Sequence, residues 1–190
     1  GQKVSLNTIS NLTASSNAPV SITGIFFSNY NSNASLHNEV SKNSIQKLES
    51  GAIGGTAPQM NGIELYNPSS LGYYVANAFN NMISLGSTVP QNAVIRGICI
   101  NGYNGMYYPP HVRLYYNTVL ISGSASYGNT SSSAALQNFN YTSNWTGGTV
   151  TYRNNIFTNL RSSGSGTAKH FAVAFGAATF HVASHNALFA

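Results

Sequence analysis

The sequence predicts an all-β solenoid, in which short strands are stacked as repeating coils. Two observations carry this prediction. One six-residue phrase recurs six times along the 190 residues, at a spacing of about 37 residues, and the residues around its copies alternate between apolar and polar. Internal repeats of this length are typical of stacked supersecondary units. Alternation with a period of two, in segments rich in Val, Ile, Tyr, Phe and Thr, favours strands.

Each copy of the phrase has an apolar residue, two spacers, an asparagine, one spacer and a second apolar residue. The copies read VSLNTI, VSKNSI, AFNNMI, LYYNTV, YRNNIF and ASHNAL. Their asparagines are Asn7, Asn43, Asn81, Asn117, Asn155 and Asn186, separated by 36, 38, 36, 38 and 31 residues. A straight strand would direct two apolar residues five positions apart to opposite faces. Both face one core only if the chain bends near the asparagine, which tolerates left-handed conformations.

A second apolar phrase recurs between the asparagines. It reads GIFF (24–27), GIELY (62–66), GICI (97–100), AALQ (134–137) and AVAFG (172–176). Each period is therefore expected to hold at least two short strands joined by a corner, with turn-rich segments between them. The segment Tyr73–Leu85 is the most helix-like part of the chain, but its registry with five strand-like phrases favours a strand.

The phrases VRLYYNTVLISG (112–123) and VTYRNNIFTNL (150–160) resemble coils of a right-handed parallel β-helix. They are similar to the repeats of the pectate-lyase-like superfamily, and the resemblance in pattern covers nearly the whole chain. It implies a right-handed parallel β-helix of about five coils, each of about 37 residues. Asparagines stacked coil over coil should hydrogen-bond along the axis, as side-chain ladders do in cross-β stacks. We therefore expect the six asparagines to be structural corner or ladder residues.

Length and composition limit the domain organisation and the kinds of partner that we expect. Residues 1–190 are expected to form a single domain, a segment of a longer chain or assembly, because neither end shows a polar capping helix. Only 6% of the residues are charged, and the net charge of +5 comes from dispersed bases, so we expect no nucleic-acid partner. No run approaches the roughly 20 apolar residues of a membrane span. The only cysteine, Cys99, lies in an apolar run and should be buried.

The ionisable residues give little support to catalysis. The chain has no aspartate, and its acids are Glu39, Glu49 and Glu64. Glycoside hydrolysis generally uses two positioned carboxylates, and calcium needs several oxygen ligands. No two of these glutamates occupy matching positions in adjacent coils, so we expect no catalytic residue in this segment and neither metal nor other cofactor.

The histidines offer one arrangement to weigh. His181 and His185 are four residues apart and would share one face of a straight strand, with His170 as a candidate third zinc ligand. A structural or surface role is the default interpretation for all three.

Aromatic residues gather near the predicted loops. An aromatic ring offers a sugar an apolar face with a polar edge, so these residues are candidates for contact with a glycan or a protein partner. The alternative is that they pack the loops onto the stack. The candidates are Tyr103, Tyr107, Tyr108, Tyr127, Tyr141 and Trp145.

Three functions are consistent with these features. The first is a non-catalytic secreted or cell-surface module, structural or adhesive, within a larger extracellular protein or filament. Its partners would be neighbouring coils or subunits, and glycans. The second is a segment of a polysaccharide lyase or glycoside hydrolase whose carboxylates lie elsewhere. The third is a self-stacking fibre or phage tailspike-like subunit. The repeat and the absent aspartate favour the first, and the composition is similar to that of secreted surface proteins of Bacteroidota.

Overall fold

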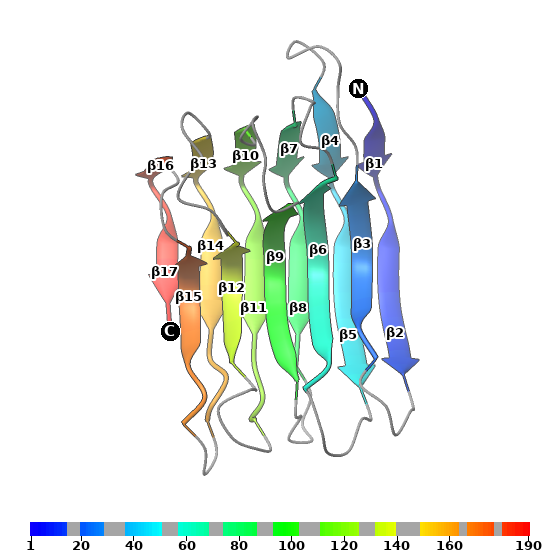
Figure 1. The fold of residues 1–190 in the computed structure, drawn as a ribbon, viewed down its shortest axis with the longest axis vertical. Helices are drawn as coiled ribbons and strands as arrows, with labels where there is room; N and C mark the ends of the chain where they lie inside the picture. Colours follow the sequence, from blue (N-terminus) through cyan, green and yellow to red (C-terminus); the bar gives the residue numbers. More distant parts are fainter. Residues whose placement is uncertain are drawn as a thin grey trace.

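The computed structural model describes residues 1–14, 20–28, 37–50, 57–68, 74–86, 93–102, 111–125, 132–139, 149–163, 167–176 and 180–190. Regular structure in these residues consists of 17 strands and no helix. All strand pairs are parallel, and the strands form three sheets (Figure 1). A membrane-crossing helix is accordingly absent from the described part of the chain.

Each sheet takes one strand from every turn of the chain. The first sheet has six strands, in the order β1 (Lys3–Ser5), β4 (Asn38–Ser41), β7 (Val75–Phe79), β10 (His111–Tyr115), β13 (Thr149–Arg153) and β16 (Phe180–Ser184). The second sheet also has six, namely β2 (Thr8–Ala14), β5 (Ser44–Ser50), β8 (Met82–Leu85), β11 (Thr118–Ile121), β14 (Ile156–Asn159) and β17 (Ala187–Phe189). The third has five, namely β3 (Ile22–Ser28), β6 (Gln59–Asn67), β9 (Val94–Gly102), β12 (Ser133–Asn138) and β15 (His170–Phe175).

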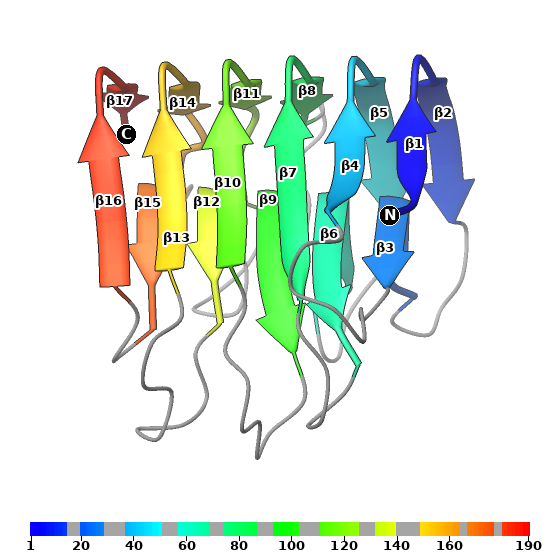
Figure 2. The same cartoon turned by 90° about the horizontal axis from the view of Figure 1, so that it is seen from above.

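The chain passes through the three sheets in turn and then returns to the first, one strand further along the axis. Figure 2 shows each strand of the first sheet leading through a tight corner into a strand of the second. The molecule is a parallel β-solenoid with about 37 residues per turn, as the repeat predicted. Strand was favoured over helix at Tyr73–Leu85, and the described part of this segment confirms it with strands β7 and β8. A complete turn has three strands, one more than the minimum expected, because the chain bends at each repeated asparagine.

The two apolar positions of the repeated phrase form two rows along the inside of the stack. Residues three before the asparagine are in register from Val4 to Ala183, and residues two after it from Ile9 to Leu188. In the four middle turns every member of both rows is buried. The bend thus directs both positions into one core, and burial of each Ile, Leu or Phe stabilises the fold by about 1.5–3 kcal/mol.

Three copies of the second phrase begin with a glycine of the third sheet that lies against an apolar side chain of the second sheet. A Cβ atom added at Gly62 would lie 2.7 Å from Cγ2 of Ile83 and 2.6 Å from the carbonyl oxygen of Gly97. At Gly97 it would lie 2.2 Å from Cγ1 of Val119. Only a residue without a side chain fits these positions, which explains why three copies of the second phrase start with Gly-Ile.

Candidate functional site

The corner between the first and second sheets has the same backbone conformation in every turn. The residue before each repeated asparagine has a positive φ, between 54° and 62°. These residues are Leu6, Lys42, Asn80, Tyr116, Asn154 and His185. The structure therefore corrects one detail of the sequence interpretation: the left-handed residue precedes the repeated asparagine. Leucine and tyrosine disfavour this conformation, so the packing on both sides of the corner imposes it.

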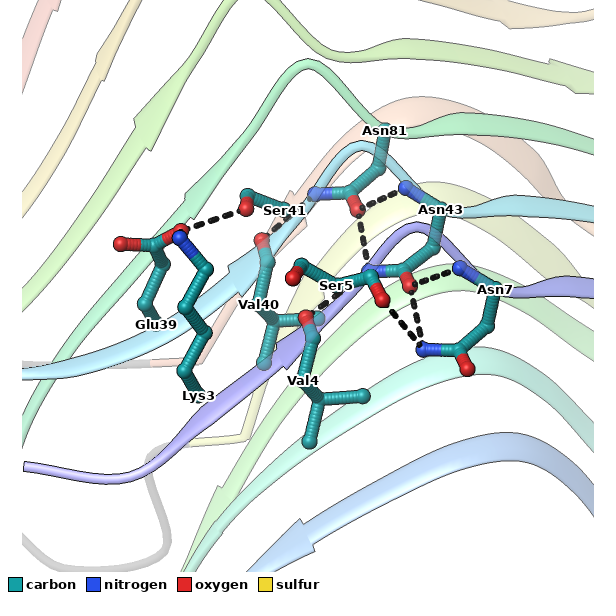
Figure 3. Close-up of polar contacts among 9 residues, drawn as sticks. All are labelled: Lys3, Val4, Ser5, Asn7, Glu39, Val40, Ser41, Asn43 and Asn81. Carbon is teal, nitrogen blue, oxygen red and sulfur yellow. Dashed lines mark hydrogen bonds and ion pairs between the residues drawn. The ribbon is translucent and has the colours of Figure 1, made fainter.

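The repeated asparagines form a continuous hydrogen-bonded ladder along the axis. Figure 3 shows its first three members, Asn7, Asn43 and Asn81. In each of five steps the side-chain Nδ2 of one asparagine donates to Oδ1 of the asparagine in the following turn, over 2.9–3.0 Å. The backbone N–H of the same residue donates to the same oxygen over 2.9–3.2 Å. The row runs through Asn7, Asn43, Asn81, Asn117, Asn155 and Asn186.

A second set of bonds ties the ladder to the strands. The Nδ2 atom of Asn81 also donates to the carbonyl oxygen of Val40, at 2.9 Å, and Asn117 makes the same bond to Ala78. The four inner asparagines are at most 2% exposed. Their side-chain amides thus have both donor hydrogens and the acceptor oxygen occupied. Since a buried amide without partners is costly, the corner suits asparagine and no other residue of its size.

Beside this ladder lies the one ion pair among the described residues. Nζ of Lys3 is 2.7 Å from Oε1 of Glu39, and the Ser41 hydroxyl donates to the same oxygen at 2.6 Å (Figure 3). The hydrogen bonds from Lys3 and then Ser41 hold the pKa of Glu39 below its usual range. Glu39 is thus an ionised, occupied carboxylate on the outer face of β4, which is unsuited to act as a general acid.

The chain's three glutamates lie on three different sheets. Glu39 belongs to β4 in the first sheet, Glu49 to β5 in the second and Glu64 to β6 in the third. Glu64 accepts bonds from Nδ2 of Asn61, at 2.8 Å, and of Asn101, at 3.0 Å. Since the chain has no aspartate, the carboxylate pair that glycoside hydrolysis generally requires does not form from these side chains.

The guanidinium group of Arg96 lies in the third sheet and shares the Asn61 side chain with Glu64 as a hydrogen-bond partner. Nη1 of Arg96 donates to Oε1 of Gln59, at 2.9 Å, and to Oδ1 of Asn61, at 3.3 Å. Cζ of Arg96 lies 4.5 Å from the centre of the Phe139 ring, a cation–π geometry. Arg96 is only 8% exposed, so these contacts stabilise the packing of β6, β9 and the segment after β12, and they leave the charge poorly accessible to a ligand.

One arrangement that the sequence interpretation missed joins a serine to a histidine. The hydroxyl of Ser133 lies 2.8 Å from Nδ1 of His170 and within hydrogen-bond distance of the Asn159 side chain. Serine–histidine contacts of this length activate nucleophiles, but Ser133 is only 3% exposed. The hydroxyl therefore acts as a polar link within the core. The second phrase did not indicate this contact, because its copies AALQ and AVAFG begin at Ala134 and Ala172, whereas the third sheet pairs Ala134 with Phe171 and Ser133 with His170.

The histidines weighed as zinc ligands do not converge. His181 lies in β16 and its ring stacks on Phe175, with 3.6 Å between ring centres. His185 is the left-handed corner residue, so the two do not share a straight strand as the spacing suggested. His170 contacts Ser133 instead. No group of three His, Cys, Asp or Glu side chains among the described residues is arranged to hold a metal ion.

The remaining candidates divide into two groups. Cys99 is buried, as expected, and burial raises the pKa of its thiol to about 12. It is therefore protonated near neutral pH and unreactive. The six aromatic candidates for glycan or partner contact lie outside the described residues, and their role stays a prediction. They are Tyr103, Tyr107, Tyr108, Tyr127, Tyr141 and Trp145.

Comparison with known proteins adds no relative, since no protein-family model, curated protein or solved structure matches the chain. The functional interpretation thus depends on the geometry alone. The arrangement that recurs in every turn is the asparagine ladder, and its chemistry is that of a saturated hydrogen-bond network. Such a network holds strands in register; it has no spare donor or acceptor in its buried part with which to bind a substrate.

Proposed function

We propose that this chain is a non-catalytic, extracellular or cell-surface β-solenoid module with a structural or adhesive role in a larger assembly. The observation that carries the proposal is the uninterrupted asparagine ladder, which spans the turns from Asn7 to Asn186. A series of buried, fully bonded amides rigidifies the stack and fixes its register. Rigidity and regular repetition suit a spacer or scaffold, and the outer faces of the sheets remain available for contacts.

The electrostatics support this proposal over an enzymatic role for the segment. The three carboxylates lie on separate sheets, and one of them is ion-paired to Lys3. The low charge content of 6% and the absence of aspartate leave few groups for proton transfer or metal binding. The proposed kinship with the pectate-lyase-like superfamily concerns the scaffold, and it is supported by the asparagine that follows an inward-facing strand at a corner. The proposed kinship with surface proteins of Bacteroidota is supported by composition alone.

A depolymerisation assay tests this proposal. The purified 190-residue chain is incubated with pectin, alginate and a neutral glucan, with calcium and with a chelator, and the release of reducing ends and of unsaturated products is followed. We expect no product in any arm. Calcium-dependent cleavage of either polyanion that is lost in the E39Q or E64Q variant would overturn the proposal. Retention of a glycan on the chain without cleavage would select the adhesive role over the purely structural one.

A further inference from the structure

The outer face of the first sheet carries two exposed arginines in adjacent turns, Arg113 in β10 and Arg153 in β13. The register pairs Tyr115 with Arg153, so the two arginines lie diagonally across neighbouring strands with Tyr115 beside both. Their Cα atoms are roughly 8 Å apart in this arrangement. Figure 2 shows β10 and β13 with a strand on each side, so the exposure of these arginines is not an effect of the open ends of the stack.

Neither arginine has a carboxylate partner within the described ranges, where the one ion pair joins Lys3 to Glu39. Strands β7, β10, β13 and β16 contain no aspartate or glutamate. Nη1 of Arg113 lies 3.3 Å from Nδ1 of His37. This partner is an imidazole nitrogen, so it orients the guanidinium group without cancelling its charge. The middle of this face thus carries two positive charges that an anionic partner would complement.

Aromatic rings and amides surround the two arginines. Phe79 lies beside Tyr115 on the adjacent strand, and both rings are half-buried. Tyr116 follows at the corner and is 60% exposed. Asn80 and Asn154 occupy the same corner position one turn to either side of Tyr116, and both are exposed. Rings of this kind pack against the apolar face of a sugar, and primary amides both donate to and accept from hydroxyl groups.

Two classes of partner do not complement this face. A second copy of the chain offers few carboxylates, because its three glutamates lie on three different sheets and two of them are already bonded. Nucleic acid generally needs more phosphate contacts than two cations can make. An anionic glycan meets both the charge of the arginines and the rings and amides around them.

The exposure of the arginines favours sulfate as the anionic group. An exposed ion pair with a strongly hydrated carboxylate contributes little to binding, because both partners keep most of their water. Guanidinium is weakly hydrated, and so is a sulfate ester, which therefore loses less on contact. The ester also has three terminal oxygens, which can accept from the Thr151 hydroxyl next to Arg113 and from the Asn154 amide next to Arg153.

We propose that the outer face of β7, β10 and β13 binds a sulfated glycan. Sulfate groups pair with Arg113 and Arg153, and a sugar ring between them packs against Tyr115. The glycan continues towards the corner, where the exposed ring of Tyr116 covers a further sugar. This inference rests on the proposed adhesive role of the module and names the ligand that it would hold.

Three dextrans of equal length test the choice of anionic group, namely unmodified dextran and dextrans carboxymethylated or sulfated to the same degree. Binding to the 190-residue chain is measured by isothermal titration calorimetry, with poly-L-glutamate as an acidic polypeptide. We expect the sulfated dextran to bind at least tenfold more tightly than the carboxymethylated dextran or poly-L-glutamate, and the unmodified dextran not to bind. The affinity should fall as salt is added, because exposed charges are screened.

Single substitutions of the arginines test the location of the site. R113Q and R153Q should each weaken the binding of dextran sulfate by about threefold to tenfold, since each removes one exposed charge-assisted contact. K47Q is the matched control, because Lys47 is an exposed cation of β5 on the second sheet. It removes the same charge from the chain and should change the affinity by less than about twofold.

A corner substitution separates ring packing from charge. Y116N removes the exposed ring but keeps a residue that the adjacent turns already have at this left-handed position, Asn80 and Asn154. Its far-UV circular dichroism should be unchanged, and its affinity for dextran sulfate should fall by about threefold. L6N makes the equivalent change at the corner of the first turn, where Leu6 is 77% exposed, and should leave the affinity unchanged.

The outcomes separate this inference from the proposed function. The inference is overturned by a chain that does not bind dextran sulfate, or that binds carboxymethyl dextran or poly-L-glutamate equally well. It is also overturned if R113Q and R153Q bind dextran sulfate as tightly as K47Q does. The scaffold proposal survives each of these results, because it depends on the depolymerisation assay. Conversely, polysaccharide cleavage would refute the non-catalytic role whatever the variants of the first sheet bind.

Discussion

At the scale of single residues, the ladder asparagines show why one side chain recurs at a corner. Asn117 receives two bonds on Oδ1 from Asn81 and gives two from Nδ2, to Ala78 and Asn155, while its backbone N–H donates to Asn155. Aspartate would lack the two side-chain donors and would bury a charge, and alanine would leave its neighbours unpaired. The residue is thus specified by the bonds it makes in both directions.

Replacement of Asn117 tests this specification. In N117A, the backbone N–H and one Nδ2 hydrogen of Asn81 lose their acceptor within a buried corner. Since each buried unsatisfied group costs about 1–3 kcal/mol, we expect the free energy of unfolding in urea to fall by about 2–5 kcal/mol. The matched control is N77A, because Asn77 lies on the outer face of β7 and its described side-chain contact is with His37, at 3.4 Å. N77A should change the free energy by less than about 0.5 kcal/mol. Equal effects of the two substitutions would refute the ladder's contribution.

At the scale of elements, the third sheet packs against the second at glycine residues, where there is no room for a side chain. Gly97 in β9 leaves room for Cγ1 of Val119 in β11, and the carbonyl oxygen of Ala135 in β12 is only slightly further away. The last turn has the opposite character. There the His181 ring lies between aromatic neighbours, stacked on Phe175 and edge-on to Tyr152 at 6.4 Å. The contact at Gly97 excludes any side chain, whereas the contact at His181 favours an uncharged ring.

The close approach at Gly97 predicts a steric penalty. In G97A, the new Cβ would lie 2.2 Å from Cγ1 of Val119 and 2.6 Å from the carbonyl oxygen of Ala135. Overpacking of this kind typically costs about 1–3 kcal/mol, and the backbone contact makes the higher part of that range the expectation here. Differential scanning fluorimetry should report a lower Tm for G97A and an unchanged one for S84A on the exposed face of β8. An unchanged Tm in G97A would show that the sheets lie further apart.

Two histidines near the C-terminal end of the stack, His170 in β15 and His181 in β16, make the stability depend on pH. Burial lowers the pKa of His181, and burial followed by the charge of Arg161 lowers that of His170. The unfolded chain therefore binds protons that the folded chain does not, from about pH 6.5 down to the folded-state pKa values. We expect the free energy of unfolding to be fully retained above pH 7 and to fall as the pH drops through this window.

A substitution identifies the contribution of His181. H181F keeps a ring next to Phe175 but cannot be protonated, so it should reduce the slope of stability against pH below about pH 6.5. S84A, on the exposed face of β8, removes no titratable group; it is the control and should leave the slope unchanged. A slope that is identical in all three proteins would place the proton-linked transition elsewhere.

At the scale of the whole molecule, the sequence repeat predicts the stacking but not all of its contacts. Two apolar anchors five residues apart, with an asparagine between them, imply a bend, and the structure has it. The exact left-handed residue could not be predicted, because Leu6 and Tyr116 adopt it under packing from neighbouring turns. The Ser133–His170 contact joins residues 37 positions apart. Its existence depends on the register of the third sheet, which single-sequence periodicity does not fix.

The central claim is that a buried amide ladder runs without interruption along the stack, and hydrogen exchange of the side chains tests it most directly. Nuclear magnetic resonance of the uniformly ¹⁵N-labelled chain in D₂O resolves the Nδ2 protons of individual asparagines. We predict that the Nδ2 protons of Asn43, Asn81, Asn117 and Asn155 exchange as slowly as the backbone amides of the core strands, whereas those of the exposed Asn11 exchange at once. Rapid exchange at the four inner asparagines would contradict the ladder and the scaffold role built on it.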